Sequence, residues 1–215
     1  PSIRDAVSSG ARIINMSYVD DGSDPSGVRD DILYALRHGV VVVSVRDNSV
    51  RAGMYDLVGE PGMNNYFPGE VTVNAVDSAG NLQESSDVMD GNVSVLSPGV
   101  GVPSYRSTDS REMVMTGNGT SAAAANLSAY LALVMQRWPD ATGNQILQSL
   151  VRNTKGNASS GPKLDPEHKR GFGIVDPGKL LSVDPAQYPD VNPLLEWAVK
   201  TSGEHEETKG MYEYP

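Results

Sequence analysis

A glycine-rich turn between a strand and a helix of small residues is the feature of this sequence best suited to chemistry. Residues 116–121 read Thr-Gly-Asn-Gly-Thr-Ser, and four alanines follow at 122–125. Ser121 therefore falls in the first turn of the predicted helix, where unpaired N–H groups and the positive end of the helix dipole favour developing negative charge. The turn predicts a serine nucleophile beside an oxyanion hole.

Two other interpretations of the turn stay open at this point. Serine is common at helix starts, so Ser121 could act only as a helix cap. Gly117, Gly119 and Ala122 also satisfy the loose dinucleotide-binding fingerprint. That fingerprint needs an acidic residue at the end of the next strand, whereas the candidate, Asp140, follows a helix. The chain has no Gly-Lys-Ser/Thr sequence, which argues against a P-loop.

Alternating strands and helices must position this turn. The valine-rich run at 40–45 is typical of a strand that is buried on both faces of a parallel sheet. Further strands are predicted at 12–15, 71–76, 93–96 and 112–115. Helices are predicted at 2–9, from Pro25 to just before Gly39, at 121–138 and at 142–152. This order predicts an α/β fold with a doubly wound, mainly parallel sheet flanked by helices.

Composition excludes several classes of function. The chain has 215 residues, 17 Lys and Arg against 27 Asp and Glu, and a net charge of −10. An acidic chain of this kind is a poor binder of phosphate backbones, so no nucleic-acid partner is expected. Its apolar runs are far shorter than the roughly 18 residues of a transmembrane helix. With no cysteine and three histidines, disulfide and thiolate chemistry is excluded and a histidine base has few candidates.

Six short motifs follow one another along the chain: Ile14–Ser17, His38–Asn48, Pro68–Val76, Ser97–Gly99, Asn118–Ser121 and Gly171–Asp176. Their order and intervals are those of the subtilisin-like serine proteases (subtilases), and the sequence resembles that family from about residue 2 to about residue 181. The resemblance implies a C-terminal portion of a subtilase catalytic domain at 1–183, with the N-terminal part of the fold missing. Residues 184–215, with seven acidic and two basic side chains, are interpreted as an acidic, proline-containing tail.

The resemblance also assigns roles to individual residues. Ser121 would attack the peptide carbonyl of a peptide or protein substrate. Asn48 and the Ser121 N–H would stabilise the oxyanion. The cleft beside the substrate would be lined by Ser17, Tyr18, Val19, Ser44, Val45, Arg46, Asp47 and Gly119. Family members are mostly exported, which implies an extracellular or cell-surface location.

The sequence departs from the family pattern at several of these positions. The triad Asp and His of the family precede every motif found here, and none of His38, His168 and His205 falls where the family has its base. The chain alone is therefore expected to be inactive. Arg46 and Asp47 stand where the family has small residues, so a non-catalytic binding or scaffold protein stays an alternative. No cofactor is expected, although the acidic loop at 20–30 could hold a structural calcium ion.

Overall fold

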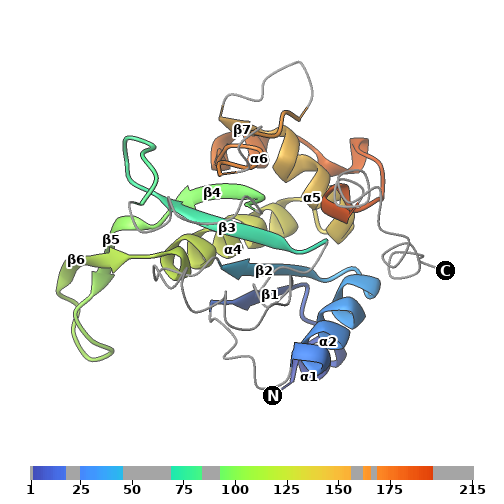
Figure 1. Ribbon diagram of the computed structural model, residues 1–215, viewed down its shortest axis with the longest axis horizontal. Helices are drawn as coiled ribbons and strands as arrows, with labels where there is room; N and C mark the ends of the chain where they lie inside the picture. The colour runs from blue at the N-terminus through green and yellow to red at the C-terminus, as the bar shows by residue number, and fades with distance from the viewer. Residues whose placement is uncertain are drawn as a thin grey trace, which may run out of the picture.

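The structure is a computed structural model of the 215-residue chain. It describes residues 2–17, 25–45, 69–83, 93–155, 162–165 and 169–195. Within these ranges the chain forms a central sheet with helices on both faces and a two-stranded arm that projects from one end (Figure 1).

The central sheet has six strands among the described residues. Their order is β1-β2-β3-β4-β8-β7, and all neighbours run parallel except β7, which is antiparallel to β8. The bounds are Ile13–Met16 (β1), Val41–Val45 (β2), Val71–Val76 (β3), Val95–Pro98 (β4), Thr154–Lys155 (β7) and Ile174–Val175 (β8). Strand β8 joins the sheet through the pair Leu96 and Ile174, which are far apart in sequence.

Helices cover both faces of the sheet, which confirms the doubly wound α/β prediction. Alternate residues of β2 serve the two faces, as the period of a strand requires. Val42 packs with α1 (Ile3–Ser8) and α2 (Pro25–Arg37), whereas Val41 and Val43 pack with α4 (Thr120–Arg137) and α5 (Gly143–Arg152). All five residues of β2 are buried, as predicted from its valine content.

The buried helix α4 lies closest to the centre of the sheet. Ala123, Ala124, Leu127, Leu131 and Val134 are all fully buried against the strands. The alanines near its start allow the helix to approach the sheet closely. Its observed bounds differ by one residue at each end from the predicted 121–138.

The two-stranded arm was only half predicted. Strand β6 (Met113–Asn118) overlaps the expected strand at 112–115, but it pairs with β5 (Val100–Tyr105) in a separate antiparallel sheet and not with the central sheet. Strand β5 was not predicted. Gly101 and Pro103 lie within it, and both residue types oppose strand formation. Cross-strand pairing with β6 provides what the local sequence does not.

The chain after β8 packs back on the body of the molecule. Helix α6 (Pro177–Ser182) is followed by a short 3-10 helix, η2 (Pro185–Gln187). Side chains of α5 hold this segment: Gln148 Nε2 donates to the carbonyl of Val191 at 2.9 Å. Leu194 and Leu195 are buried. Residues 184–195 of the predicted tail are thus described and packed, and residues 196–215 lie outside the described part of the chain.

Candidate active site

Ser121 lies at the start of α4, where the arm ends and the buried helix begins. The helix N-cap is Gly119, and no side chain caps the helix. The hydroxyl of Ser121 is therefore not a capping group, and the interpretation of Ser121 as a helix cap is wrong. Thr120 is fully buried while Ser121 is exposed. The Ser121 side chain is therefore accessible to solvent, while the adjacent Thr120 is buried in the protein.

Backbone packing fixes the position of this turn. The N–H of Gly119 donates to the carbonyl of Gly99 at 2.9 Å. A Cβ on Gly99 would lie 2.7 Å from the Gly119 oxygen and 2.8 Å from the Cβ atoms of Ala123 and Ala75. Only glycine fits where the end of β4, the start of α4 and β3 meet this closely.

The end of β1 lies against the first turn of α4. The Ser121 Oγ donates to the Ser17 carbonyl at 3.4 Å, and the Ser17 Oγ lies 3.5 Å from the Ser121 carbonyl. The Ser17 hydroxyl also donates to Asn15 Oδ1 at 2.7 Å. Two serines that are 104 residues apart in sequence thus meet at the carboxyl edge of the parallel sheet, where open α/β sheets place their ligands.

Asn126, which the sequence marks only as a departure from the family pattern, makes a contact that was not predicted. It lies in α4 after Ser121, and its Nδ2 donates to the carbonyl of Pro98 at 2.8 Å. This bond joins the first turns of α4 to the end of β4. The sequence signal that could have predicted this contact is the position of Asn126 in the same helix, five residues after the candidate nucleophile Ser121.

Most of the predicted cleft residues lie outside the described part of the chain. This holds for Asn48 and for Tyr18, Val19, Arg46 and Asp47. Ser44 and Val45, at the end of β2, are each 2% exposed. Strand β2 ends at the same edge of the sheet as β1. The predicted roles of the cleft residues stay predictions.

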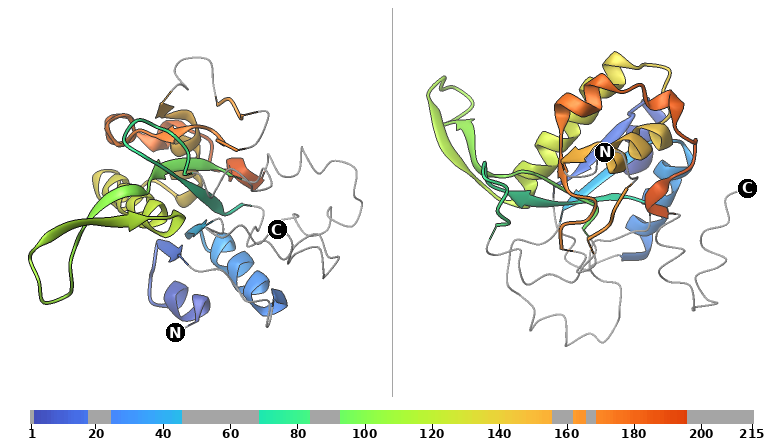
Figure 2. Two further views of the ribbon diagram at one scale, coloured as in Figure 1. Left: turned by 60° about the vertical axis from the view of Figure 1, so that its left-hand side comes forward. Right: turned by 90° about the horizontal axis from the view of Figure 1, so that it is seen from above.

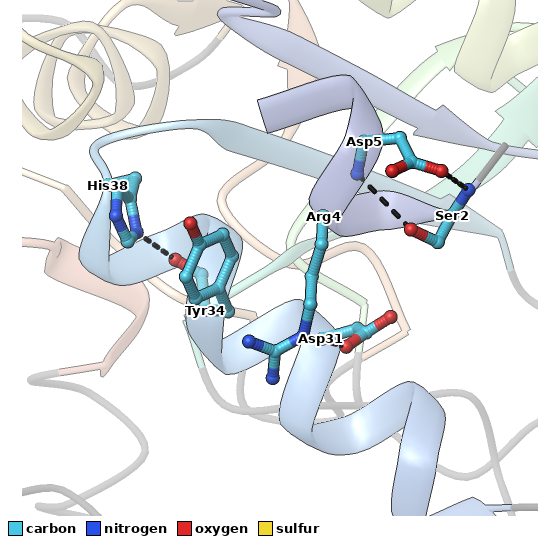
Figure 3. Close-up of polar contacts among 6 residues, drawn as sticks. All are labelled: Ser2, Arg4, Asp5, Asp31, Tyr34 and His38. Atoms are coloured by element: carbon cyan, nitrogen blue, oxygen red, sulfur yellow. Dashed lines mark hydrogen bonds and ion pairs between the residues drawn. The ribbon is translucent and has the colours of Figure 1, made fainter. Parts of the chain in front are cut away.

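His38 is remote from Ser121. It follows the last turn of α2 and precedes β2, at the opposite edge of the sheet from the Ser17 and Ser121 contact. Its Nδ1 lies 2.8 Å from the Tyr34 carbonyl oxygen, and its ring centroid lies 4.1 Å from that of Tyr34 (Figure 3). The Arg4 guanidinium lies over the Tyr34 ring, 4.5 Å from its centroid, and donates to Asp31. His168 and His205 lie outside the described residues. No described histidine can act as the base for Ser121.

The resolved pKa shifts also lie outside this site. The pKa of Asp5 is lowered by hydrogen bonds from Ser2, of which the one from the backbone N–H has the larger effect. The pKa of Asp77 is lowered by hydrogen bonds from the side chain and the backbone of Asn81.

In the described ranges, no group of three or more His, Cys, Asp or Glu side chains is placed to hold a metal ion. Of the segment at 20–30, where calcium was considered, residues 20–24 lie outside the described part of the chain and residues 25–30 form the start of α2 and not a loop. No described helix is both long and apolar enough to span a membrane.

Comparison with known proteins gives consistent matches. The model of the subtilase family (Peptidase_S8) matches residues 1–174. Subtilisin DY of Bacillus licheniformis is 28% identical over 171 residues, which are 80% of this chain and 57% of subtilisin DY. The chain thus spans little more than half the length of this relative.

Solved structures with the same fold include two proteases. Fervidolysin from Fervidobacterium pennivorans, a keratinolytic enzyme related to subtilisin, superposes with a TM-score of 0.58 at 25% identity, over 84% of this chain and 28% of its own. The MycP3 protease from the type VII (ESX-3) secretion system superposes with a TM-score of 0.59 at 27% identity, over 85% of this chain and 56% of its own.

Proposed function

The chain belongs to the subtilase family, and from this premise we propose that it carries the nucleophile of a serine endopeptidase. The observation that supports this most is the placement of Ser121. Its exposed hydroxyl stands at the start of the buried helix α4, in contact with Ser17 at the carboxyl edge of the sheet. That placement combines an accessible nucleophile with the N–H groups of a helix terminus.

In the proposed reaction the Ser121 Oγ attacks the carbonyl carbon of a peptide bond and forms an acyl-enzyme. The amine product leaves with a proton, and water then hydrolyses the ester. The Ser121 N–H and the side chain of Asn48 are proposed to donate hydrogen bonds to the oxyanion. The hydrogen bond from the Ser121 Oγ to the Ser17 carbonyl is 3.4 Å long, well beyond the usual O–H···O distance. A bond this weak leaves the hydroxyl able to turn toward substrate.

The reaction also needs a base, because an unassisted serine hydroxyl is a weak nucleophile at neutral pH. We propose that the base and its orienting carboxylate come from a part of the protein outside this chain, so that the chain alone is inactive. Strand β1 supports this, since among the described strands it pairs only with β2. No described strand lies along its other edge, and strand edges of this kind are normally covered or paired.

The substrate class and location are proposed on the same basis. Peptide or protein substrates follow from the reaction. An extracellular or cell-surface location is supported by the MycP3 protease of a type VII secretion system, which shares the fold.

An active-site probe tests the proposal directly. The full-length protein, folded and purified, is treated with a fluorophosphonate, which labels activated serines. We expect labelling that is lost in Ser121→Ala and kept in Ser128→Ala. Ser128 is a matched control because it lies in the same helix with a hydroxyl that has no hydrogen-bond partner among the described residues.

Absence of fluorophosphonate labelling in a folded full-length protein would refute the proposal that the protein is a serine protease. The replacement of small residues by Arg46 and Asp47 would then favour a cleft that is retained for binding in a non-catalytic scaffold protein.

A further inference from the structure

Two consecutive carbonyl groups at the end of β4 hold the start of α4. The carbonyl of Gly99 accepts a hydrogen bond from the Gly119 N–H at 2.9 Å, and the carbonyl of Pro98 accepts one from Asn126 Nδ2 at 2.8 Å. The Gly99 N–H in turn donates to the carbonyl of Val76, at the end of β3, at 3.0 Å. Residues 98 and 99 therefore connect the start of α4 to the centre of the sheet.

The contacts of Ser121 toward β1 are longer than these. The Ser121 Oγ lies 3.4 Å from the Ser17 carbonyl oxygen, and the Ser17 Oγ lies 3.5 Å from the Ser121 carbonyl oxygen. Hydroxyl groups form their best hydrogen bonds at about 2.7–2.8 Å. The position of the first turn of α4 is therefore set mainly from β4, where the hydrogen bonds are 2.8 and 2.9 Å long. Figure 2 shows the arm leaving the body of the molecule at this same end of α4.

Apolar packing of α4 leaves its rotation about its own axis weakly defined. The buried side chains Ala123 and Leu127 contact the sheet, but apolar contacts have no preferred direction. A hydrogen bond is directional. Asn126 is half-buried and lies between the buried Leu127 and the exposed Ala125 in sequence. A hydrogen bond from this border of the buried face to a fixed carbonyl of the sheet resists rotation of the helix.

Rotation of α4 changes where the Ser121 hydroxyl points, because Ser121 lies in the first turn of this helix. Asn126 follows five residues later, a rise of about 7.5 Å along the helix axis, and its Nδ2 is bound to Pro98. Asn126 therefore acts on the site through the helix and not by contact with the reacting bond.

We propose that Asn126 is a positioning residue for the Ser121 nucleophile: its hydrogen bond to the Pro98 carbonyl fixes the rotation of α4 and thereby the direction of the Ser121 hydroxyl. This rests on the proposed protease function. The amide nitrogen is essential to the role, because a carbonyl oxygen only accepts hydrogen bonds.

Two substitutions at Asn126 test the role. Asn126→Asp keeps the shape of the side chain but has no hydrogen to donate when it is ionised, and Asn126→Leu is a neutral change of similar size. The full-length protein is assayed with a fluorogenic peptide that the wild type cleaves. In both variants we expect kcat to fall about ten- to a hundredfold, as small misplacements of reacting groups do, and KM to stay unchanged. In Asn126→Leu the pH dependence of kcat should keep its midpoint, because the base is not altered.

Asn153 provides the matched control. It is also partly buried, and its Nδ2 also donates to a backbone carbonyl, that of Ser149, at 2.9 Å. It is the C-cap of α5 and contacts Tyr188 of the C-terminal segment, so it has no part in the proposed site. The same two substitutions at Asn153 should lower the Tm by a similar amount and leave kcat unchanged.

The outcomes separate this proposal from the proposed function. Unchanged kcat in folded Asn126 variants of an active enzyme overturns the positioning role and leaves the protease standing. An equal fall in kcat in the Asn153 variants also overturns it, because activity then follows stability. Loss of the cooperative thermal transition in both Asn126 variants overturns it as well, since Asn126 is then needed for the fold itself. A folded wild-type protein that neither cleaves peptides nor reacts with a fluorophosphonate refutes the proposed function, and this role with it.

Discussion

Helix α4 and the β5–β6 arm meet at one junction but are stabilised differently. Leu127 and Leu131 in α4 are fully buried between sheet and helices, so side-chain burial holds the helix. Tyr105 and Met113 in the arm are more than half exposed, so its backbone ladder and the Arg106 to Glu112 contact hold the ribbon. The difference indicates that the turn bearing Ser121 derives its rigidity from the helix side.

The largest effect is expected from emptying space under α4. Leu127→Ala removes a fully buried side chain and should lower the free energy of unfolding by about 3 kcal/mol, through lost burial and the cavity that remains. Leu133→Ala, in the same helix but at a 47% exposed position, should change it by less than about 0.5 kcal/mol. Urea denaturation followed by circular dichroism measures both. Equal effects would contradict the assignment of stability to the buried face.

A smaller loss is expected at the junction of the two regions. Gly99→Ala places a methyl group within 2.8 Å of three atoms on β3 and α4, and crowding of this kind costs about 1–3 kcal/mol. Gly178→Ala is the matched control, because its Cβ would meet only Asp176 Oδ1 at 3.4 Å. The variants are compared by thermal denaturation. If the Tm of Gly99→Ala equals that of Gly178→Ala, the close packing of the junction is not needed for stability.

The smallest effect is expected at the tip of the arm. Arg106→Ala removes the ion pair between Arg106 and Glu112, whose two side chains are 62% and 58% exposed, respectively. Because ion pairs this exposed contribute little, the free energy of unfolding should fall by less than about 1 kcal/mol. Amide hydrogen exchange should rise across β5 and β6 and stay unchanged in α4. Faster exchange in α4 as well would show that the two regions are energetically coupled.

The same contrast explains what the sequence could predict. Strand β2 and helix α4 were predicted because a single run of mostly apolar residues specifies each of them: the valines at 40–45 for β2 and the apolar stretch at 121–138 for α4. Strand β5 was not, because its stability comes from pairing with β6, and Gly101 and Pro103 oppose a strand locally. The two-residue strands β7 and β8 are too short to give any periodic signal.

The candidate site shows a similar division. The place of Ser121 at the start of a helix was predicted from the turn alone, whereas its role as a nucleophile and not a helix cap was assigned through the family resemblance. Its contact with Ser17 spans 104 residues, and Ser17 could be named only through resemblance to a family. The fit at Gly99 depends on atoms from β3 and α4 together, which no local pattern encodes.

The pairing of Leu96 with Ile174 has a consequence for synthesis of the chain. Strand β4 leaves the ribosome well before β8, with α4, α5 and the arm translated in between. The outer edge of β4 therefore stays unpaired until β8, which follows α5, has been synthesised. Contacts of such long range slow folding and leave strand edges exposed in the nascent protein, so this edge is where a chaperone has most to protect.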